Sequence, residues 1–217
     1  MKISPSKETI LKKIRQALTH PVPVPFPGSE GTDSVFQPSE QELELSFAEN
    51  FTTLQGRFSF CESMEEMVQQ LQLLIANRGW KHLYSNETEL KNSLTEHGIK
   101  QPLDATSLRN CDASITGCEA LIARTGSILL SSGQQSGRTT SVYAPVHICI
   151  AYTSQLVYDI KDALQLVKEK YDQLPSFLTL ATGPSRTADI EKTLVVGVHG
   201  PKEVFCFLVE QPANNNS

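Results

Sequence analysis

The sequence predicts an α/β protein in which a mostly parallel sheet is flanked by helices. Apolar runs typical of strands buried on both faces occur at 146–152 and 203–209. Segments with the apolar spacing of helices alternate with such runs, most clearly at 63–79 and 156–171. Strands that alternate with helices imply right-handed crossover connections, which produce a parallel sheet. A chain of 217 residues is also long enough to bury a core without disulfides or metals.

An N-terminal arm, residues 1–58, is expected ahead of the sheet. Residues 6–18 place apolar side chains on one face of a helix, with Ser6 as its N-cap. Four prolines between positions 21 and 27 then favour an extended segment, because proline fixes φ and lacks an N–H donor. This segment is a stiff linker or a ligand for an SH3-like partner. The rest of the arm is polar, with one short helix expected at 40–50.

The α/β domain is expected to span 59–212, and the tail at 213–217 is expected to be disordered. The first helix of the domain, at 63–79, has Ser63 and Glu66 at the spacing of a capping box. In such a box each side chain accepts a hydrogen bond from a backbone N–H that the helix leaves unpaired. The sequence therefore fixes the start of this helix closely.

The following elements are expected in alternating order. A strand at 80–85 leads to a helix that Asn86 caps and that stops at Gly98. The centre, 115–132, is rich in strand-forming residues, and 177–181 reads as another buried strand before the last one.

Composition excludes several classes of protein. Nineteen basic and 24 acidic side chains give a net charge of −5, which argues against nucleic-acid binding. Five cysteines without a C-x-x-C pair argue against a disulfide framework and against an iron–sulfur or zinc site built by this chain alone. The N-terminus lacks the apolar region of a secretory signal, and no run approaches the ~20 apolar residues of a membrane span. We therefore expect a cytoplasmic protein.

Ligands of open α/β sheets collect at loops beyond the carboxyl ends of strands, and three loops are candidates. The first is a turn between apolar segments, in which glycine and exposed N–H groups favour an anion. The residues of this turn are Arg124, Thr125, Gly126 and Ser127. The alternative is a plain hairpin, because a glycine-containing turn between apolar runs is common. The second loop, 131–141, combines two glycines, several hydroxyls and Arg138, and is either a binding loop or a solvated connector.

The third loop, 182–201, directly follows the strand expected at 177–181. Ser185 or Thr187 is placed to cap a short helix that begins near Ala188, and a helix N-terminus is a seat for phosphate or carboxylate. The residues proposed for this seat are Gly183, Ser185, Arg186, Thr187 and Gly200.

The same loop carries the candidate catalytic side chains. Asp189 and Glu191 either bind a metal, orient a hydroxyl or merely favour the helix N-terminus. His199 lies between two glycines, where it is either an acid or base or a hydrogen-bonding part of the loop. No Walker motif, G-x-S-x-G, H-E-x-x-H or G-x-G-x-x-G is present, so a Rossmann dinucleotide site is disfavoured.

Three segments resemble a known family. TGPSRTADIEKTLVVGVHGP at 182–201 resembles the C-terminal signature of the LUD-domain family, the lactate-utilization protein C (LutC/YkgG) family. ITGCEALIARTGSILL at 115–130 resembles the central turn of that family, and APVHICIA at 144–151 resembles the strand that follows. The family usually has an acidic residue where this chain has Arg124, so the resemblance leaves the ligand open.

The resemblance implies a fold similar to the NagB/RpiA/CoA-transferase group. It also implies a role in oxidising L-lactate to pyruvate with two partners, an iron–sulfur ferredoxin-like subunit and a cysteine-rich subunit. On this interpretation any enzymatic role is that of a subunit of an L-lactate dehydrogenase-type iron–sulfur oxidoreductase. The clusters lie in a partner, no cofactor is held by this chain alone, and a small carboxylate, phosphate or nucleotide is a candidate ligand. The alternatives are a free-standing ligase or transferase that uses a phosphorylated cofactor, and a non-catalytic scaffold or regulator.

Overall fold

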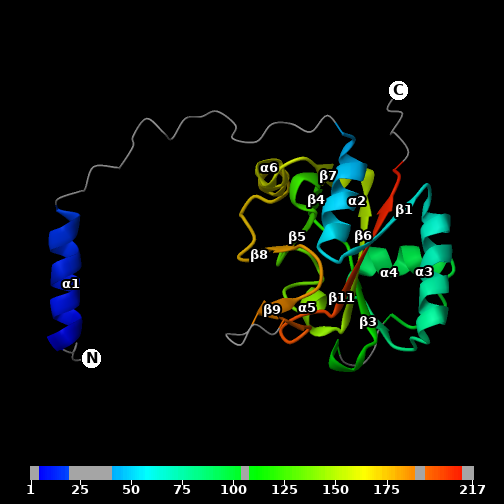
Figure 1. Ribbon diagram of the computed structural model, residues 1–217, viewed down its shortest axis with the longest axis horizontal. Helices are drawn as coiled ribbons and strands as arrows, with labels where there is room; N and C mark the ends of the chain where they lie inside the picture. Colours follow the sequence, from blue (N-terminus) through cyan, green and yellow to red (C-terminus); the bar gives the residue numbers. More distant parts are fainter. Residues whose placement is uncertain (1–4, 20–40, 104–107, 189–193, 212–217) are drawn as a thin grey trace. The chain divides into compact units, whose positions relative to one another are not determined.

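The computed structural model describes residues 5–19, 41–103, 108–188 and 194–211, which fall into two compact units divided after Gln37 (Figure 1). In the first unit, α1 (Pro5–Leu18) confirms the helix expected at 6–18. The proline-rich segment and the expected tail at 213–217 lie outside the described residues. No helix in the described part of the chain is long and apolar enough to cross a membrane.

The second unit contains the predicted parallel sheet. Its strands are β1 (Arg57–Cys61), β2 (Leu83–Tyr84), β3 (Ala113–Thr116), β6 (Val146–Tyr152) and β11 (Glu203–Val209). They run in the order β1-β11-β6-β3-β2, and every neighbouring pair is parallel. The two apolar runs of the sequence are the central strands β6 and β11, as expected for strands buried on both faces.

A second, mixed sheet covers one face of the first and was not foreseen. Its strands are β7 (Leu156–Val157), β4 (Ala120–Ile122), β5 (Ser127–Ser131) and β8 (Leu178–Ala181), in that order. The β4–β5 and β5–β8 pairs are antiparallel, so most of the strand-rich centre forms a hairpin, and only its first two residues, 115–116, belong to β3 of the parallel sheet. Strand β8 is an edge strand and is only partly buried, which corrects the buried strand expected at 177–181.

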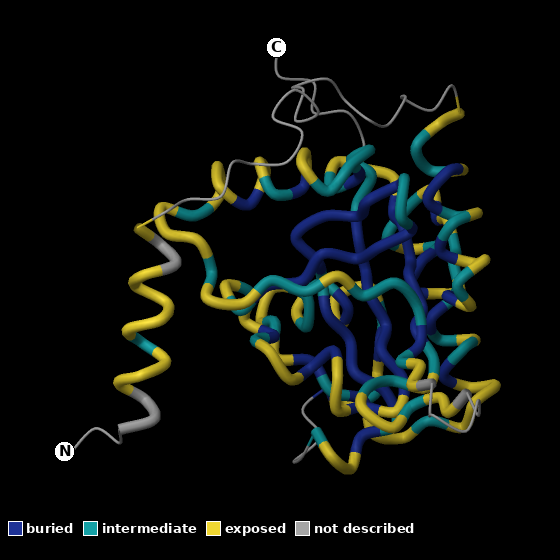
Figure 2. Tube along the Cα trace, turned by 60° about the vertical axis from the view of Figure 1, so that its left-hand side comes forward, coloured by how far each residue is buried: buried dark blue, intermediate teal, exposed yellow. Residues whose placement is uncertain are grey.

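Helices complete the layers around these two sheets. Helices α3 (Met64–Arg78) and α4 (Thr88–Glu96) pack on one face of the parallel sheet, and α2 (Leu43–Thr53) packs on the other face beside the second sheet. Helix α6 (Ile160–Lys170) covers the outer side of the second sheet. Figure 2 shows the buried trace concentrated in the central strands between these helices.

Short elements connect the layers. They are α5 (Thr140–Tyr143), the hairpin of β9 (Arg186–Ala188) and β10 (Leu194–Val196), and three 3-10 turns, η1 (Leu108–Asn110), η2 (Ala123–Thr125) and η3 (Thr153–Gln155). The compact unit begins at Pro38 and therefore takes in α2, which the sequence assigns to the arm. Helix α2 belongs to the body because Phe47 and Phe51 are fully buried in its core.

Helix boundaries were predicted with mixed success. Ser63 accepts the N–H of Glu66 at 3.2 Å and Gly79 ends α3 in the left-handed conformation, as expected. The capping box is only half formed, because Glu66 accepts the N–H of Glu62 at 2.8 Å and not that of Ser63. Asn86 is not the cap of α4, because its side chain donates to the carbonyl of Gln135 at 2.9 Å instead. Helix α6 begins at Ile160 rather than at 156, because Asp159 caps it and the preceding residues pair with β4 as β7.

Candidate functional site

The first predicted loop, 124–127, is the turn between β4 and β5, and it packs directly against α2. Gly126 has φ of 57°, and a methyl group added there would lie 2.4 Å from the backbone nitrogen of Phe51 in α2. Asn50 of α2 also donates to the carbonyl of Ala123 at 2.9 Å. The glycine is therefore required for close packing against α2, which is the hairpin alternative of the sequence.

The guanidinium of Arg124 forms an ion pair within the protein. The guanidinium of Arg124 pairs with Asp159 at 2.8 Å, and the backbone N–H of Arg124 donates to the carbonyl of Tyr158 at 3.0 Å. The hydrogen bond from Arg124 lowers the pKa of the Asp159 carboxyl. Arg124 thus connects the β4–β5 turn to the start of α6.

The third predicted loop forms a hairpin, not a helix N-terminus. Thr187 of β9 pairs with Val195 of β10, so the helix expected near Ala188 is wrong. Gly183 has φ of 102°, and a methyl group there would lie 2.4 Å from the carbonyl oxygen of Leu54, so this glycine also serves close packing. Asp189 and Glu191 lie outside the described residues.

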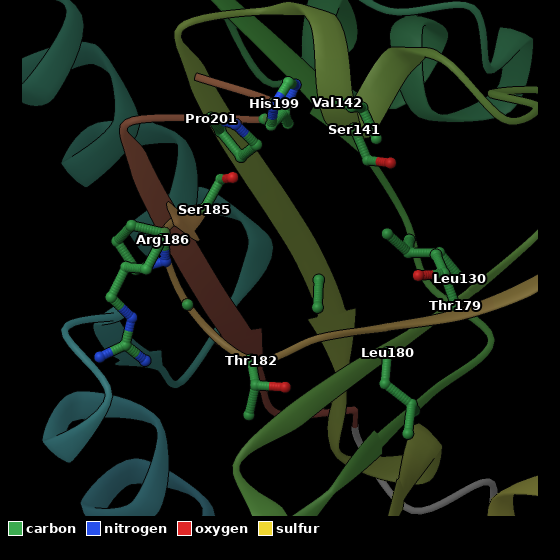
Figure 3. Close-up of a pocket in the computed structure, with 14 residues that line it drawn as sticks. Leu130, Ser141, Val142, Thr179, Leu180, Thr182, Ser185, Arg186, His199 and Pro201 are labelled. Carbon is green, nitrogen blue, oxygen red and sulfur yellow. The ribbon is translucent and has the colours of Figure 1, made fainter. Parts of the chain in front are cut away.

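A cleft of about 420 Å³ nevertheless lies beside this loop (Figure 3). Its walls are formed by Leu130, Ser141, Val142, residues 179–186 and residues 199–201. The hydroxyls of Ser141, Thr182 and Ser185 and the ring of His199 supply its polar groups. The guanidinium of Arg186 extends away from these hydroxyls, so the cation faces outward in this conformation.

The position of this cleft differs from the one expected. Helix α5 precedes β6, and Gly200 and Pro201 precede β11, so the cleft lies at the amino ends of these strands. The sequence placed the loop 182–201 at the carboxyl edge because it follows a strand. That strand is β8, which lies at the edge of the second sheet and is not part of the parallel sheet.

Hydroxyl groups connect the first loop to this cleft. Ser127 is buried, and its Oγ lies 2.7 Å from the Oγ1 of Thr125 and 3.3 Å from the Oγ1 of Thr182. Thr182 lines the cleft directly. The turn at 124–127 therefore supports one wall of the cleft without opening into it.

The second predicted loop is divided between different surroundings. Ser141 lines the cleft, whereas Gly133, Gln134 and Gln135 line another cavity. Arg138 does not line the cleft, because its guanidinium donates to Ser176 at 2.7 Å and lies 5.5 Å from the ring centroid of Phe177. The three predicted loops thus do not converge on a single site.

The other cavity, of about 510 Å³, lies at the carboxyl ends of β3 and β6 and was not predicted. It is lined by Glu87, Glu89, Leu90, Ser93, Gly117, Cys118, Gly133, Gln134, Gln135, Ile150, Tyr152, Gln155, Lys170 and Tyr171. The signal that could have found it is Gly117-Cys118-Glu119, directly after the strand that begins at 113.

His147, Cys149 and Cys206 are titratable side chains that are buried within the strands of the parallel sheet and line neither cavity. His147 is fully buried, its Nε2 lies 2.8 Å from the Oγ1 of Thr116, and burial lowers the pKa of His147 to about 4. Cys149 and Cys206 are fully buried in the apolar cluster between the sheets. Among the described residues no group of three or more His, Cys, Asp or Glu side chains is arranged to hold a metal ion.

Two layered sheets, with cavities at both ends of the parallel strands, define the chain as an α/β domain. The family model of the LUD domain matches residues 45–209, and the chain belongs to this family.

Relatives and a solved structure agree with this placement. The chain is 39% identical to an uncharacterized protein of Neisseria meningitidis over 100 residues, which cover 46% of this chain and 43% of that protein. It is 37% identical to lactate utilization protein C of Bacillus licheniformis over 99 residues (44% and 41%) and 34% identical to that of Deinococcus radiodurans over 109 residues (50% and 51%). The matched stretches span about half or less of each of these relatives.

A DUF162 family protein from Deinococcus radiodurans has the same fold. Its crystal structure superposes with a TM-score of 0.58 at 20% sequence identity, over 80% of this chain and 99% of that one. The predicted fold class, an α/β domain with a mostly parallel sheet flanked by helices, is confirmed.

Proposed function

We propose that this chain is a component of a lactate-utilization system and that its cleft binds a small carboxylate. The observation that carries the proposal is that residues 182–186 and 199–201, the two ends of the segment that resembles the family signature, line this cleft. The names of the relatives support lactate utilization as the process. L-lactate and pyruvate are the ligands that such a process would present.

The side chains of the cleft are suited to a small carboxylate. The hydroxyls of Ser141, Thr182 and Ser185 are donors for carboxylate oxygens, and His199 lies on the same wall as Ser185. Arg186 is exposed on β9, and a change of its rotamer would bring a guanidinium to the ligand. The ligand would then be held by hydroxyls inside and by one cation at the rim.

The surface around the cleft supports association with a partner. Apolar side chains that are more than a third exposed occur on α5, β8 and β10 and at the residue beside His199: Val142, Tyr143, Leu180, Val195, Val196 and Val198. Val142 and Leu180 line the cleft itself, and exposed apolar surface of this kind supports contact with a partner. We propose that a subunit carrying iron–sulfur clusters or a cysteine-rich subunit covers this surface and performs the electron transfer of lactate oxidation.

Two measurements test this function. The tagged chain, purified from its host grown on L-lactate, should retain an iron–sulfur protein, and Val196→Asp together with Val198→Asp should release it. Titration calorimetry of the full chain with L-lactate and pyruvate should show binding, which Arg186→Met weakens about tenfold. Arg138→Met is the matched control, because Arg138 does not line the cleft. No captured iron–sulfur protein and no heat with either acid would reject the proposal.

A scaffold role without ligand chemistry makes a different prediction. Under that role, replacing Asp189, Glu191 and His199 together by Asn, Gln and Asn should leave growth on L-lactate unchanged. Loss of growth with an unchanged circular dichroism spectrum would favour the proposed ligand site over the scaffold.

A further inference from the structure

The cavity at the carboxyl ends of β3 and β6 is separate from the proposed carboxylate cleft. Helix α4 contributes one wall and the C-terminal end of α6 another, and these helices lie on opposite sides of the parallel sheet (Figure 1). The loop of Gly133, Gln134 and Gln135 joins them. Crevices at this end of parallel strands are where α/β sheets usually bind ligands.

The α6 wall presents the ammonium group of Lys170, which the buried carboxylate of Glu119 holds in place. Glu119 has a side chain only 1% exposed, and it accepts hydrogen bonds from Lys170 Nζ at 2.8 Å, from Tyr171 at 2.7 Å and from the hydroxyl of Ser131. Desolvation raises the pKa of the Glu119 carboxyl, but these hydrogen bonds outweigh it and leave the pKa below its ordinary value. Lys170 has three donors and uses one on Glu119, so its ammonium remains available to an anionic group.

The α4 wall presents carboxylates. Glu87 Oε2 accepts the N–H of Gly117 at 3.0 Å, while its Oε1 is buried and has no hydrogen-bond partner among the described residues. Glu89 lies on the same wall. The wall is fixed in place, because Gln135 accepts the N–H of Thr88 at 2.7 Å. A ligand with N–H donors would complement this wall.

The two charged walls together restrict the ligand. A simple anion would meet Glu87 and Glu89, and a simple amine would meet Lys170, so neither complements both walls. Between them, Leu90, Ile150 and Tyr152 provide apolar and aromatic surface. We infer that this cavity binds a zwitterion, an α-amino acid with a large apolar side chain, with its carboxylate on Lys170 and its ammonium on the Glu87 wall. The volume of about 510 Å³ leaves room for such a side chain.

Calorimetry of the full chain tests this inference with three matched compounds. The probes are L-phenylalanine, 3-phenylpropionate, which lacks the ammonium group, and 2-phenylethylamine, which lacks the carboxylate. L-leucine and L-tryptophan extend the range of side chains. We expect at least one of the three amino acids to bind, and each analogue of phenylalanine to bind at least tenfold more weakly than phenylalanine itself. No binding by any amino acid, or equal binding by an analogue, would overturn the inference.

Substitutions then assign the two walls. Glu87→Gln is nearly isosteric and should weaken the amino acid about tenfold without weakening 3-phenylpropionate, whose carboxylate the Glu87 charge repels. Lys170→Met should weaken the amino acid similarly, and the paired variant Glu119→Gln with Lys170→Met covers the case in which the single variant fails to fold. Glu96→Gln on α4 and Lys168→Met on α6 are exposed controls that should change nothing. Unchanged affinity in Glu87→Gln would also overturn the inference. L-lactate binding to the cleft should persist in all these variants, so the two proposals fail separately.

Discussion

The two ends of the parallel strands are built in different ways. The cleft at the amino ends of β6 and β11 is lined by hydroxyls and bordered by exposed apolar side chains, and its one arginine faces outward. At the cavity at the carboxyl ends, a buried carboxylate behind the wall, Glu119, fixes the lining residues Lys170 and Tyr171 in place. The first arrangement is suited to a partner or a ligand that reshapes the surface, and the second to a ligand that meets preformed charges. Residues 182–186 and 199–201, from the segment that resembles the C-terminal family signature, therefore line the end that sheet geometry does not favour.

The largest effect should come from breaking the support of the amino-end cleft. Gly126→Ala would force a left-handed residue against the backbone of Phe51 and should destabilise the protein by about 3 to 5 kcal/mol. Gly79→Ala is the matched control, since φ is 65° there and no atom lies within 4 Å of the added methyl. It should cost only about 1 to 2 kcal/mol in urea denaturation. If both variants lost the same free energy of unfolding, α2 would be able to shift and accommodate the added methyl group, which would contradict this prediction.

His147, in the amino half of β6, should give the protein an acid sensitivity. Its pKa falls from 6.5 to about 4 on burial, so the native state favours the neutral ring. The resulting stability is complete above pH 6.5 and is lost as the pH falls towards 4, by about 3 kcal/mol. Urea denaturation at pH 7, 5.5 and 4 should show this slope in the native chain and a flatter curve in His147→Leu. A parallel slope in both proteins would contradict burial of a neutral His147.

Glu119, at the carboxyl end, should respond in a lower pH range. Its pKa lies below 4.5 in the folded protein, so its contribution is present above that pH and is lost as the pH falls through the folded value. Glu119→Gln weakens the hydrogen bonds of Lys170 and Tyr171 and should cost about 1 to 3 kcal/mol at pH 7, with a smaller difference from the native chain at pH 3. The measurement is again urea denaturation. A constant difference at both pH values would mean that the carboxylate charge is not what stabilises this end.

The sequence predicted the parallel sheet well for a physical reason. Strands β6 and β11 are buried on both faces, so nearly every residue is apolar and the pattern is local and continuous. The hairpin of β9 and β10 was missed because its pairing joins residues across 189–193, while Ser185 and Thr187 have the local pattern of a helix start. The predicted start of helix α6, at 156, was too early. Leu156 belongs to β7 and pairs with β4, and the apolar periodicity of the sequence does not reveal this contact.

The candidate site was predicted less well than the fold. Ser185, Arg186, His199 and Gly200 do line one cleft, because they are close in the chain. The carboxyl-end network joins Glu119 to Lys170, 51 residues later, and only the fold brings them together. A pairing over such a distance leaves no signal in local spacing, so a single sequence contains no trace of it.

The smallest expected effect concerns Arg138, which the sequence proposed as an anion ligand. Its guanidinium contacts Ser176 and the ring of Phe177, away from the cleft lining. Arg138→Met should therefore lower the free energy of unfolding by only about 0.5 to 1 kcal/mol, the value of an exposed cation–π contact. It should leave the affinity for L-lactate or pyruvate unchanged, whereas Arg186→Met should reduce it. A loss of carboxylate affinity in Arg138→Met would show that Arg138 reaches the ligand, and would weaken the distinction between the two ends, because the 131–141 loop borders both.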